Sequence, residues 1–160
     1  MLQTEDELAA LSAVIGASFG GVKSMTATSG PGFSLMAETI GLASMSEIPV
    51  VIVDVQRAGP STGMPTKTEQ GDLNAALYQG HGDAGRIVLA PANVEDCFWL
   101  TVKAFNLAER LQMPAILLSE QSLSDRAELI SKPDLARIQV ENRLRPDYNR
   151  VAETDPFKRY

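Results

Sequence analysis

Cysteine, histidine and tryptophan are almost absent, with one of each in 160 residues. Cys97 has no second cysteine with which to form an internal disulfide, and alone it cannot supply a zinc or iron–sulfur site. Basic residues are also scarce: 14 Lys and Arg against 20 Asp and Glu give a net charge of −6. This balance argues against a nucleic-acid partner and against a polybasic membrane patch.

Long apolar runs are missing too. No run approaches the roughly 20 residues that span a bilayer, because Gly, Ser, Asp or Arg interrupts each one. The first residues, MLQTEDELAAL, are acidic and lack the basic start of a signal peptide. We therefore expect no membrane partner and a cytoplasmic location.

What is present is typical of a folded domain. Hydrophobic residues make up 44% and charged residues 21% of the chain, close to ordinary globular proteins. Apolar residues at helical spacing alternate with short β-branched runs. Helices are expected at Glu5–Gly16, Phe33–Ser46, Glu69–Tyr78 and from Asn93 to about Leu111, and strands within Val22–Thr28, Ile48–Val55, Arg86–Ala90 and Pro114–Leu118. This order predicts an α/β fold, an open and mostly parallel sheet with helices on both faces.

The domain is expected to span residues 1–125. From residue 126 to 160, apolar residues thin out and Arg and Pro appear without periodicity. We interpret residues 126–160 as an extended arm or linker towards a missing C-terminal domain. An α/β domain that opens on a helix, not a strand, is also expected to be incomplete at its N-terminus.

Two loops follow neighbouring predicted strands and meet at the carboxyl edge of the sheet, where open α/β folds bind ligands. The first is the turn Thr26–Gly32, in which glycines permit a close approach of the backbone to a flat ligand. The second is Gln56–Thr68, where Arg57 offers a fork that matches a carboxylate. A plain βα turn and a solvated surface arginine are the alternatives. Two such loops at one edge predict a site for an anionic substrate.

The same stretches resemble a known family. TSGPG followed by a helix and then IPVVIVDVQR resembles the pyrimidine-binding module of thiamine-diphosphate enzymes. The fuller run, from TATSGPGFSLMAETIG through QRAGPSTGMPTKTEQGDL, is similar to the alpha subunit of 2-oxoacid:ferredoxin oxidoreductases, particularly the 2-oxoglutarate type. The resemblance spans about residues 3–125, and QRAGPSTGMPTKTEQGD is its most specific part.

The resemblance implies a role for particular residues. Glu5, 23 positions before Thr28, matches the glutamate that activates the cofactor, although an ordinary acid in the first turn of a helix is the alternative. Its neighbours Asp6 and Glu7 match no catalytic position and are read as solvated. The remaining implied contacts are Thr28, Ser29, Gly30 and Pro31 with the cofactor, and Arg57, Thr62 and Thr66 with the substrate. His81 is similar to a family histidine without an assigned role, and we expect it to be structural.

The resemblance also implies a reaction and its partners. A 2-oxoacid, by resemblance 2-oxoglutarate, would be decarboxylated oxidatively to an acyl-coenzyme A, with electrons passing to ferredoxin. The thiamine-diphosphate site would be shared with a beta subunit that holds Mg²⁺ and an iron–sulfur cluster, so the isolated chain is expected to be inactive. A non-oxidative decarboxylase or acetolactate-synthase-like enzyme, and a non-catalytic oligomerisation module, are the alternatives.

Overall fold

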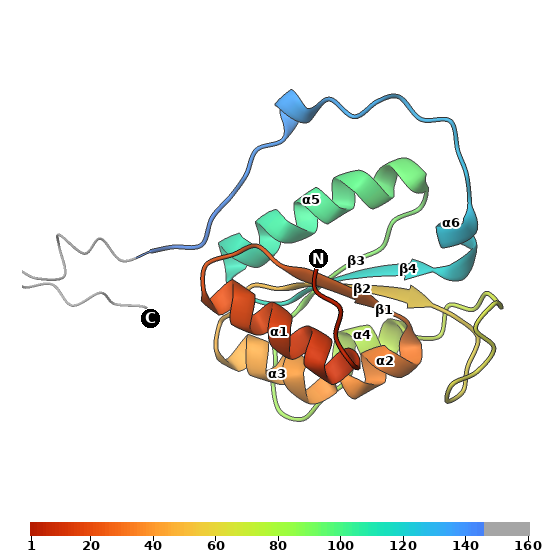
Figure 1. Ribbon diagram of the computed structural model, residues 1–160, viewed down its shortest axis with the longest axis horizontal. Helices are drawn as coiled ribbons and strands as arrows, with labels where there is room; N and C mark the ends of the chain where they lie inside the picture. The colour runs from red at the N-terminus through yellow and green to blue at the C-terminus, as the bar shows by residue number, and fades with distance from the viewer. Residues whose placement is uncertain (146–160) are drawn as a thin grey trace, which may run out of the picture.

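A four-stranded parallel sheet forms the centre of the protein (Figure 1). The computed structural model describes residues 1–145. The strands run in the spatial order β1-β2-β4-β3. They are β1 (Met25–Thr28), β2 (Val51–Gln56), β3 (Ile87–Leu89) and β4 (Ala115–Glu120). β2 and β4 lie in the middle and carry the most buried runs, as expected for parallel strands covered on both faces.

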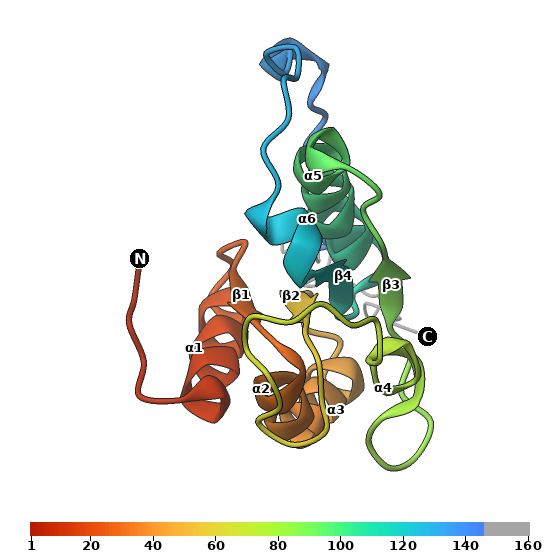
Figure 2. The ribbon, with the colours of Figure 1, turned by 90° about the vertical axis from the view of Figure 1, so that its right-hand side faces the viewer.

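Helices cover both faces of this sheet, which confirms the predicted fold class (Figure 2). One face carries α1 (Glu7–Phe19), α2 (Gly30–Leu35), α3 (Ala37–Met45) and α4 (Leu73–Tyr78). The other face carries α5 (Val94–Leu111), and the short α6 (Gln121–Asp125) follows β4. The carboxyl ends of β1, β2 and β4 point to one side of the molecule, where the loops after β1 and β2 leave the sheet (Figures 1 and 2).

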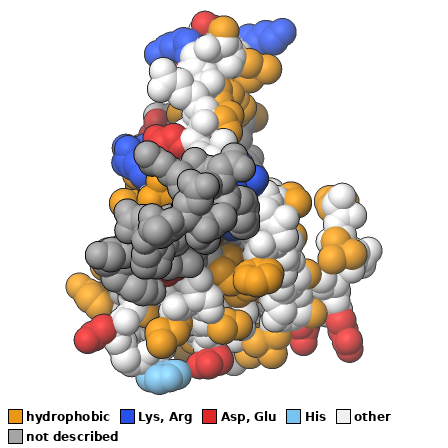
Figure 3. All heavy atoms as spheres, turned by 90° about the vertical axis from the view of Figure 1, so that its left-hand side faces the viewer, with side chains coloured by type: hydrophobic (Ala, Val, Ile, Leu, Met, Phe, Trp, Pro, Cys, Tyr) orange, Lys and Arg blue, Asp and Glu red, His pale blue; other side chains and the backbone are white. Residues whose placement is uncertain are grey.

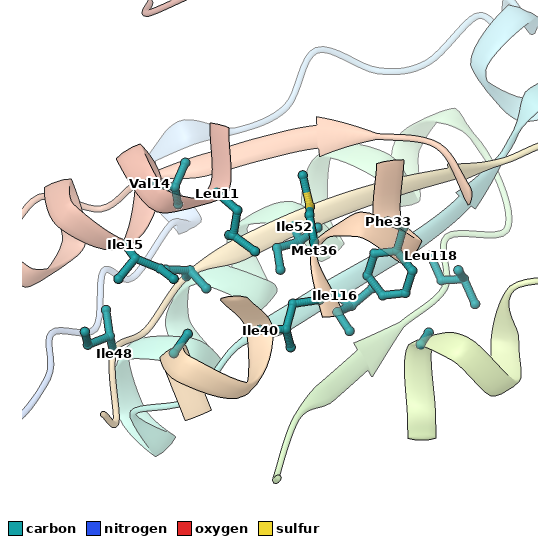
Figure 4. Close-up of a cluster of buried hydrophobic side chains, with 13 residues drawn as sticks. Leu11, Val14, Ile15, Phe33, Met36, Ile40, Ile48, Ile52, Ile116 and Leu118 are labelled. Carbon is teal, nitrogen blue, oxygen red and sulfur yellow. The ribbon is translucent and has the colours of Figure 1, made fainter. Parts of the chain in front are cut away.

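The larger core lies between the sheet and the first group of helices (Figure 4). Leu11 of α1, Phe33 of α2 and Ile40 of α3 are fully buried there against Ile52 and Ile116 of the sheet. Each such side chain contributes about 1.5–3 kcal/mol by leaving water. A smaller cluster under α5 contains Val51, Ala104, Ala108 and Ala115. Both turns that follow β1 and β2 are therefore fixed to well-packed elements.

The helices differ from the sequence-based expectation at several points. Helix α1 runs from Glu7 to Phe19, not from Glu5 to Gly16, α4 begins at Leu73, not at Glu69, and α6 was not predicted. The segment predicted as one helix, Phe33–Ser46, is divided into α2 and α3, because the backbone at Met36 leaves regular helical geometry. Met36 N–H donates to the carbonyl oxygens of both Gly32 and Phe33, as in a tightened final turn. Helix α2 also begins earlier than predicted, at Gly30, with Pro31 in its first turn, where a missing N–H costs little.

The segment after α6 passes over α5 without joining the sheet (Figure 1). Within residues 126–145 the structure contains one element, the 3-10 turn η1 (Leu135–Arg137). The guanidinium of Arg137 lies 5.7 Å from the ring centroid of Trp99 on α5. Arg143 is hydrogen-bonded to Glu109 and Ser18. The predicted arm is thus extended but attached as far as residue 145, and its remainder, 146–160, lies outside the described residues.

Candidate functional site

The turn after β1 brings the predicted cofactor residues together. Thr28 ends β1 beside Asp54 of β2, and Ser29 caps α2 with extended backbone and no capping hydrogen bond from its side chain. Gly30 and Pro31 form the first turn of α2. These residues lie at the carboxyl edge of the sheet (Figure 2), as the sequence predicted.

Two glycines of this turn permit close approaches that a side chain would prevent. A Cβ at Gly30 would lie 2.7 Å from Oδ2 of Asp72. A Cβ at Gly32 would overlap Oγ1 of Thr28 and lie 2.5 Å from Cγ of Glu7. The turn is therefore in contact with two carboxylate side chains that reach it from distant parts of the chain.

The start of α1 places the acidic residues differently from the expectation. Asp6 caps the helix, which begins at Glu7 and not at Glu5, and Asp6 Oδ1 accepts from Ala9 N–H at 2.7 Å. Glu5 precedes the helix and is exposed. Glu7, read from the sequence as solvated, is half-buried and packs against Gly32. Both glutamates line a groove of about 570 Å³ between α1 and β1, but only Glu7 touches the turn in this way.

The loop after β2 folds back on itself and brings Arg57 to the same edge. Ala58 N–H donates to Lys67 O and Met64 N–H donates to Ala58 O, both at 2.9 Å. Gly63, with a φ of +61°, passes so close to Ala58 O that a Cβ would overlap it. This hairpin-like closure gives the loop a defined shape, although most of its surface is exposed.

A cavity of about 360 Å³ separates this loop from the turn after β1. Arg57, half-buried, donates from Nη2 to the carbonyl oxygen of Thr62 at 3.0 Å, and its Nε has no partner within residues 1–145. The cavity is lined by Gly30, Pro31, Arg57, Thr62 and Asp72, among others. The structure therefore brings four of the predicted site residues to one cavity, whereas Thr66 is exposed and does not line it.

Two carboxyl groups were not found by the sequence analysis, namely Asp72, which is half-buried and lines this cavity, and Asp54, which is fully buried on β2. Asp54 is 0% exposed, and neither of its oxygens has a hydrogen-bond partner in the described part of the chain. Burial, followed by the nearby charge of Asp72, raises the pKa of Asp54 to about 7. The pKa of Asp72 is itself raised by burial and by Glu69. An acid within the apolar run of β2 was the signal that could have shown this position.

His81 does not belong to the site. Its side chain is 91% exposed, and its Nδ1 lies 3.7 Å from Oε2 of Glu38, which is exposed as well. Figure 3, viewed from the side opposite to that of Figure 2, shows the histidine on the surface. The expectation of a structural histidine is therefore wrong, because no core packs around it.

Within residues 1–145, no helix combines the length and the apolar character that a membrane span requires. The same residues contain no group of three or more His, Cys, Asp or Glu side chains arranged to hold a metal ion.

Comparison with known proteins relates this arrangement to one family. The family described as "Pyruvate flavodoxin/ferredoxin oxidoreductase, thiamine diP-bdg" matches residues 1–160. The chain is 50% identical over 157 residues to the 2-oxoglutarate synthase subunit KorA of Methanothermobacter marburgensis, covering 98% of this chain and 41% of that protein. It is 53% identical over 138 residues to the subunit of the same name from Archaeoglobus fulgidus, covering 86% and 40%.

A solved structure shares the fold. The 2-oxoglutarate:ferredoxin oxidoreductase from Magnetococcus marinus, described with 2-oxoglutarate, coenzyme A and succinyl-CoA bound, superposes with a TM-score of 0.87 at 50% identity. The match covers 92% of this chain and 26% of that chain. The chain thus spans less than half the length of these relatives.

A family match along all 160 residues, together with a parallel sheet that carries the glycine turn and the arginine loop at one edge, leads to one conclusion. This chain belongs to the thiamine-diphosphate-binding family of pyruvate flavodoxin/ferredoxin oxidoreductases.

Proposed function

We propose that this chain forms the pyrimidine side of a thiamine-diphosphate site in a 2-oxoacid:ferredoxin oxidoreductase that acts on 2-oxoglutarate. Relatives named for 2-oxoglutarate synthesis or oxidation at 43–53% identity support this substrate. The product would be an acyl-coenzyme A, with electrons passing to ferredoxin. A beta subunit would hold the diphosphate, Mg²⁺ and an iron–sulfur cluster.

The geometry of the turn after β1 fits the aminopyrimidine part of the cofactor. Gly32 leaves the Glu7 side chain room beside the turn, and Thr28 and Ser29 provide oxygen atoms at the same place. A half-buried carboxylate is suited to sharing a proton with a ring nitrogen. When bound, thiamine diphosphate supplies the carbon nucleophile and the electron sink for decarboxylation.

Two acids are candidates for the residue that holds this proton. The family resemblance points to Glu5, whereas the contact with Gly32 favours Glu7. A carboxylate that must stay beside a ring nitrogen benefits from a fixed backbone and partial burial, and Glu7 has both as the first residue of α1. We therefore assign the cofactor-activating role to Glu7 and retain Glu5 as the competing assignment.

Arg57 is the residue we assign to the substrate carboxylate. Its side chain lines the cavity of about 360 Å³, and its buried Nε–H has no hydrogen-bond partner within residues 1–145. Thr62 lines the same cavity and accepts from Arg57 through its carbonyl oxygen, which orients the guanidinium. Thr66 would take part only after a movement of the loop.

Paired substitutions in the assembled enzyme test the proposal. The assay is viologen reduction that depends on 2-oxoglutarate, coenzyme A and thiamine diphosphate, with cofactor binding measured separately by calorimetry. Glu7→Gln should lower turnover by about 100-fold or more, the scale of a lost proton-transfer group, and Glu5→Gln should change it by less than about threefold.

A large loss of turnover in Glu5→Gln and a small one in Glu7→Gln would make Glu5 the cofactor-activating residue. Decarboxylation or condensation of the 2-oxoacid without viologen reduction would make the enzyme non-oxidative. Activity independent of thiamine diphosphate would overturn the proposed function.

A further inference from the structure

Asp72, on the wall of the cavity that contains Arg57, and Asp54, buried in the sheet, form a pair of carboxyl groups. Asp54 is on β2, next to Thr28 of β1 and Leu118 of β4 in the parallel register. It projects on the same face as Ile52, which belongs to the larger core, because alternate residues of a strand share a face. Its side chain is therefore enclosed between the sheet and the helices on that face.

Asp72 connects this buried group with the cavity. Its backbone N–H donates to Oε1 of Gln56 at 2.9 Å, which fixes the residue just before α4. Its Oδ2 lies against Gly30 and, like both oxygens of Asp54, is buried without a hydrogen-bond partner among residues 1–145. Asp72 lines the cavity together with Arg57.

Two neighbouring carboxylates in such surroundings do not both ionise readily. Burial and the charge of Asp72 raise the pKa of Asp54 to about 7, so Asp54 loses its proton, and the pair gains one negative charge, near neutral pH. Hydrogen bonds from Ser122 hold the pKa of Glu120, at the end of β4, below its usual range, so Glu120 stays ionised throughout. Further charged side chains on the surrounding segments are Glu7 of α1, Glu38 of α3, and Arg57, Lys67 and Glu69 of the loop after β2.

We propose that the Asp54–Asp72 pair controls the affinity of the Arg57 cavity for an anionic substrate, which binds well while Asp54 is protonated and poorly once Asp54 has lost its proton. This inference rests on the proposed function in one respect, namely that the cavity takes the carboxylate of the 2-oxoacid. The loss of the proton adds a negative charge beside the cavity and attracts Arg57 away from the ligand. 2-Oxoglutarate itself carries two charges throughout this pH range, because free carboxyl groups titrate near pH 4.

The expected size of the effect follows from Coulomb's law. With an effective dielectric constant of about 20, one added charge weakens the binding of a carboxylate about tenfold when the two charges are on the order of 10 Å apart. The effect falls on binding, because Asp54 is enclosed in the core and does not reach the reacting atoms.

The test compares the assembled enzyme with its Asp54→Asn and Asp72→Asn variants between pH 6 and 8.5. In the unsubstituted enzyme, KM for 2-oxoglutarate should rise about tenfold across neutral pH, while kcat follows a different profile. In Asp54→Asn this rise should disappear. Asp83→Asn, at an exposed position outside the cavity, should retain it. Circular dichroism shows whether each variant folds. If Asp54→Asn does not fold, the pH dependence of KM in Asp72→Asn takes its place as the test.

A second measurement separates this inference from the proposed function. Glutarate, which lacks the keto group and cannot react, is titrated calorimetrically into the same proteins at pH 6 and 8.5. If glutarate binds more weakly at pH 8.5 than at pH 6 to the unsubstituted protein but not to Asp54→Asn, the inference is supported. This holds even if no viologen is reduced, a result that would contradict only the proposed reaction. The same pH dependence in Asp54→Asn and the unsubstituted protein, or no glutarate binding at all, overturns the inference.

Discussion

Arg143 attaches the segment after α6 to the domain, and its substitution gives a quantitative test of that attachment. Its Nε and Nη2 donate to the two carboxylate oxygens of Glu109 at 3.0 and 2.8 Å. Nη1 and Nη2 also donate to the backbone oxygen and Oγ of Ser18, at 2.7 and 3.0 Å. The side chains of Arg143 and Glu109 are only 17% and 5% exposed.

The loss of stability expected for Arg143→Ala depends on which partners Glu109 retains. Removing one partner of a buried ion pair costs about 3–5 kcal/mol, because the other charge stays buried. Lys23, whose Nζ lies 3.4 Å from Oε1 of Glu109, remains, so we expect the lower end, about 3 kcal/mol. Arg143→Lys keeps the charge but loses the planar fork and should cost about half as much.

Chemical unfolding followed by circular dichroism measures these costs, and the same segment supplies a control. Arg110 and Glu141 form an ion pair at 3.7 Å whose side chains are 57% and 40% exposed. Arg110→Ala should therefore change the free energy of unfolding by less than about 1 kcal/mol. An equally small change for Arg143→Ala would refute the reasoning and show that the segment is not held in solution.

The pH dependence of the Arg143→Ala effect is a further part of this prediction. Burial alone would raise the pKa of Glu109, but the hydrogen bonds and charge of Arg143, with Lys23, outweigh it and hold that pKa below its usual range. Such a carboxylate adds stability above its unfolded pKa, and this stability is lost as the pH falls through the folded value. The cost of Arg143→Ala should therefore be largest near neutral pH and shrink in acid.

Three further substitutions test the site. Asp54→Asn should raise the free energy of unfolding at pH 8 by at most about 4 kcal/mol and leave it almost unchanged at pH 4. The reason is that the raised pKa of Asp54 makes the folded state lose stability as the pH rises from about 4 to about 7. Urea unfolding at both pH values measures this difference. Gly32→Ala should cost about 1–3 kcal/mol and weaken calorimetric binding of thiamine diphosphate, because the added methyl group displaces Thr28 and Glu7. Arg57→Ala should raise KM for the 2-oxoacid at least about tenfold without lowering the unfolding temperature, as steady-state kinetics and thermal unfolding would show.

The fold could be predicted because its signals are local. The β-branched run at Ile48–Val55 forms a central strand that is buried on one face and half-buried at Val53 and Val55 on the other, and breaker residues separate it from the next elements. The division of the helix predicted at Phe33–Ser46 had no comparable signal. Phe33, Met36 and Ile40 are all fully buried, so their spacing also suits one uninterrupted helix.

The position of the acidic residue could not be settled by counting along the chain. Helix α1 begins at Glu7, after its cap Asp6, and not at Glu5 as the sequence predicted. Glu5 therefore lies outside the helix and is exposed, whereas Glu7, in the first turn, is half-buried and packs against Gly32. The family spacing counts residues before Thr28, whereas the contact of a glutamate with Gly32 depends on where helix α1 begins.

The carboxyl pair shows a different limit. An acid at position 54 within an apolar strand is visible as an anomaly, but its partner lies beyond a loop whose path no local pattern determines. That path is set by non-local contacts: Gln56 accepts from Asp72 N–H, and Glu69 accepts from Gly59 N–H, both at 2.9 Å. The same contacts that close the arginine loop therefore bring Asp72 to the cavity. A loop that positions the cation for a substrate anion also positions the opposing carboxylate, and this is why we expect binding by Arg57 and titration of the pair to be coupled.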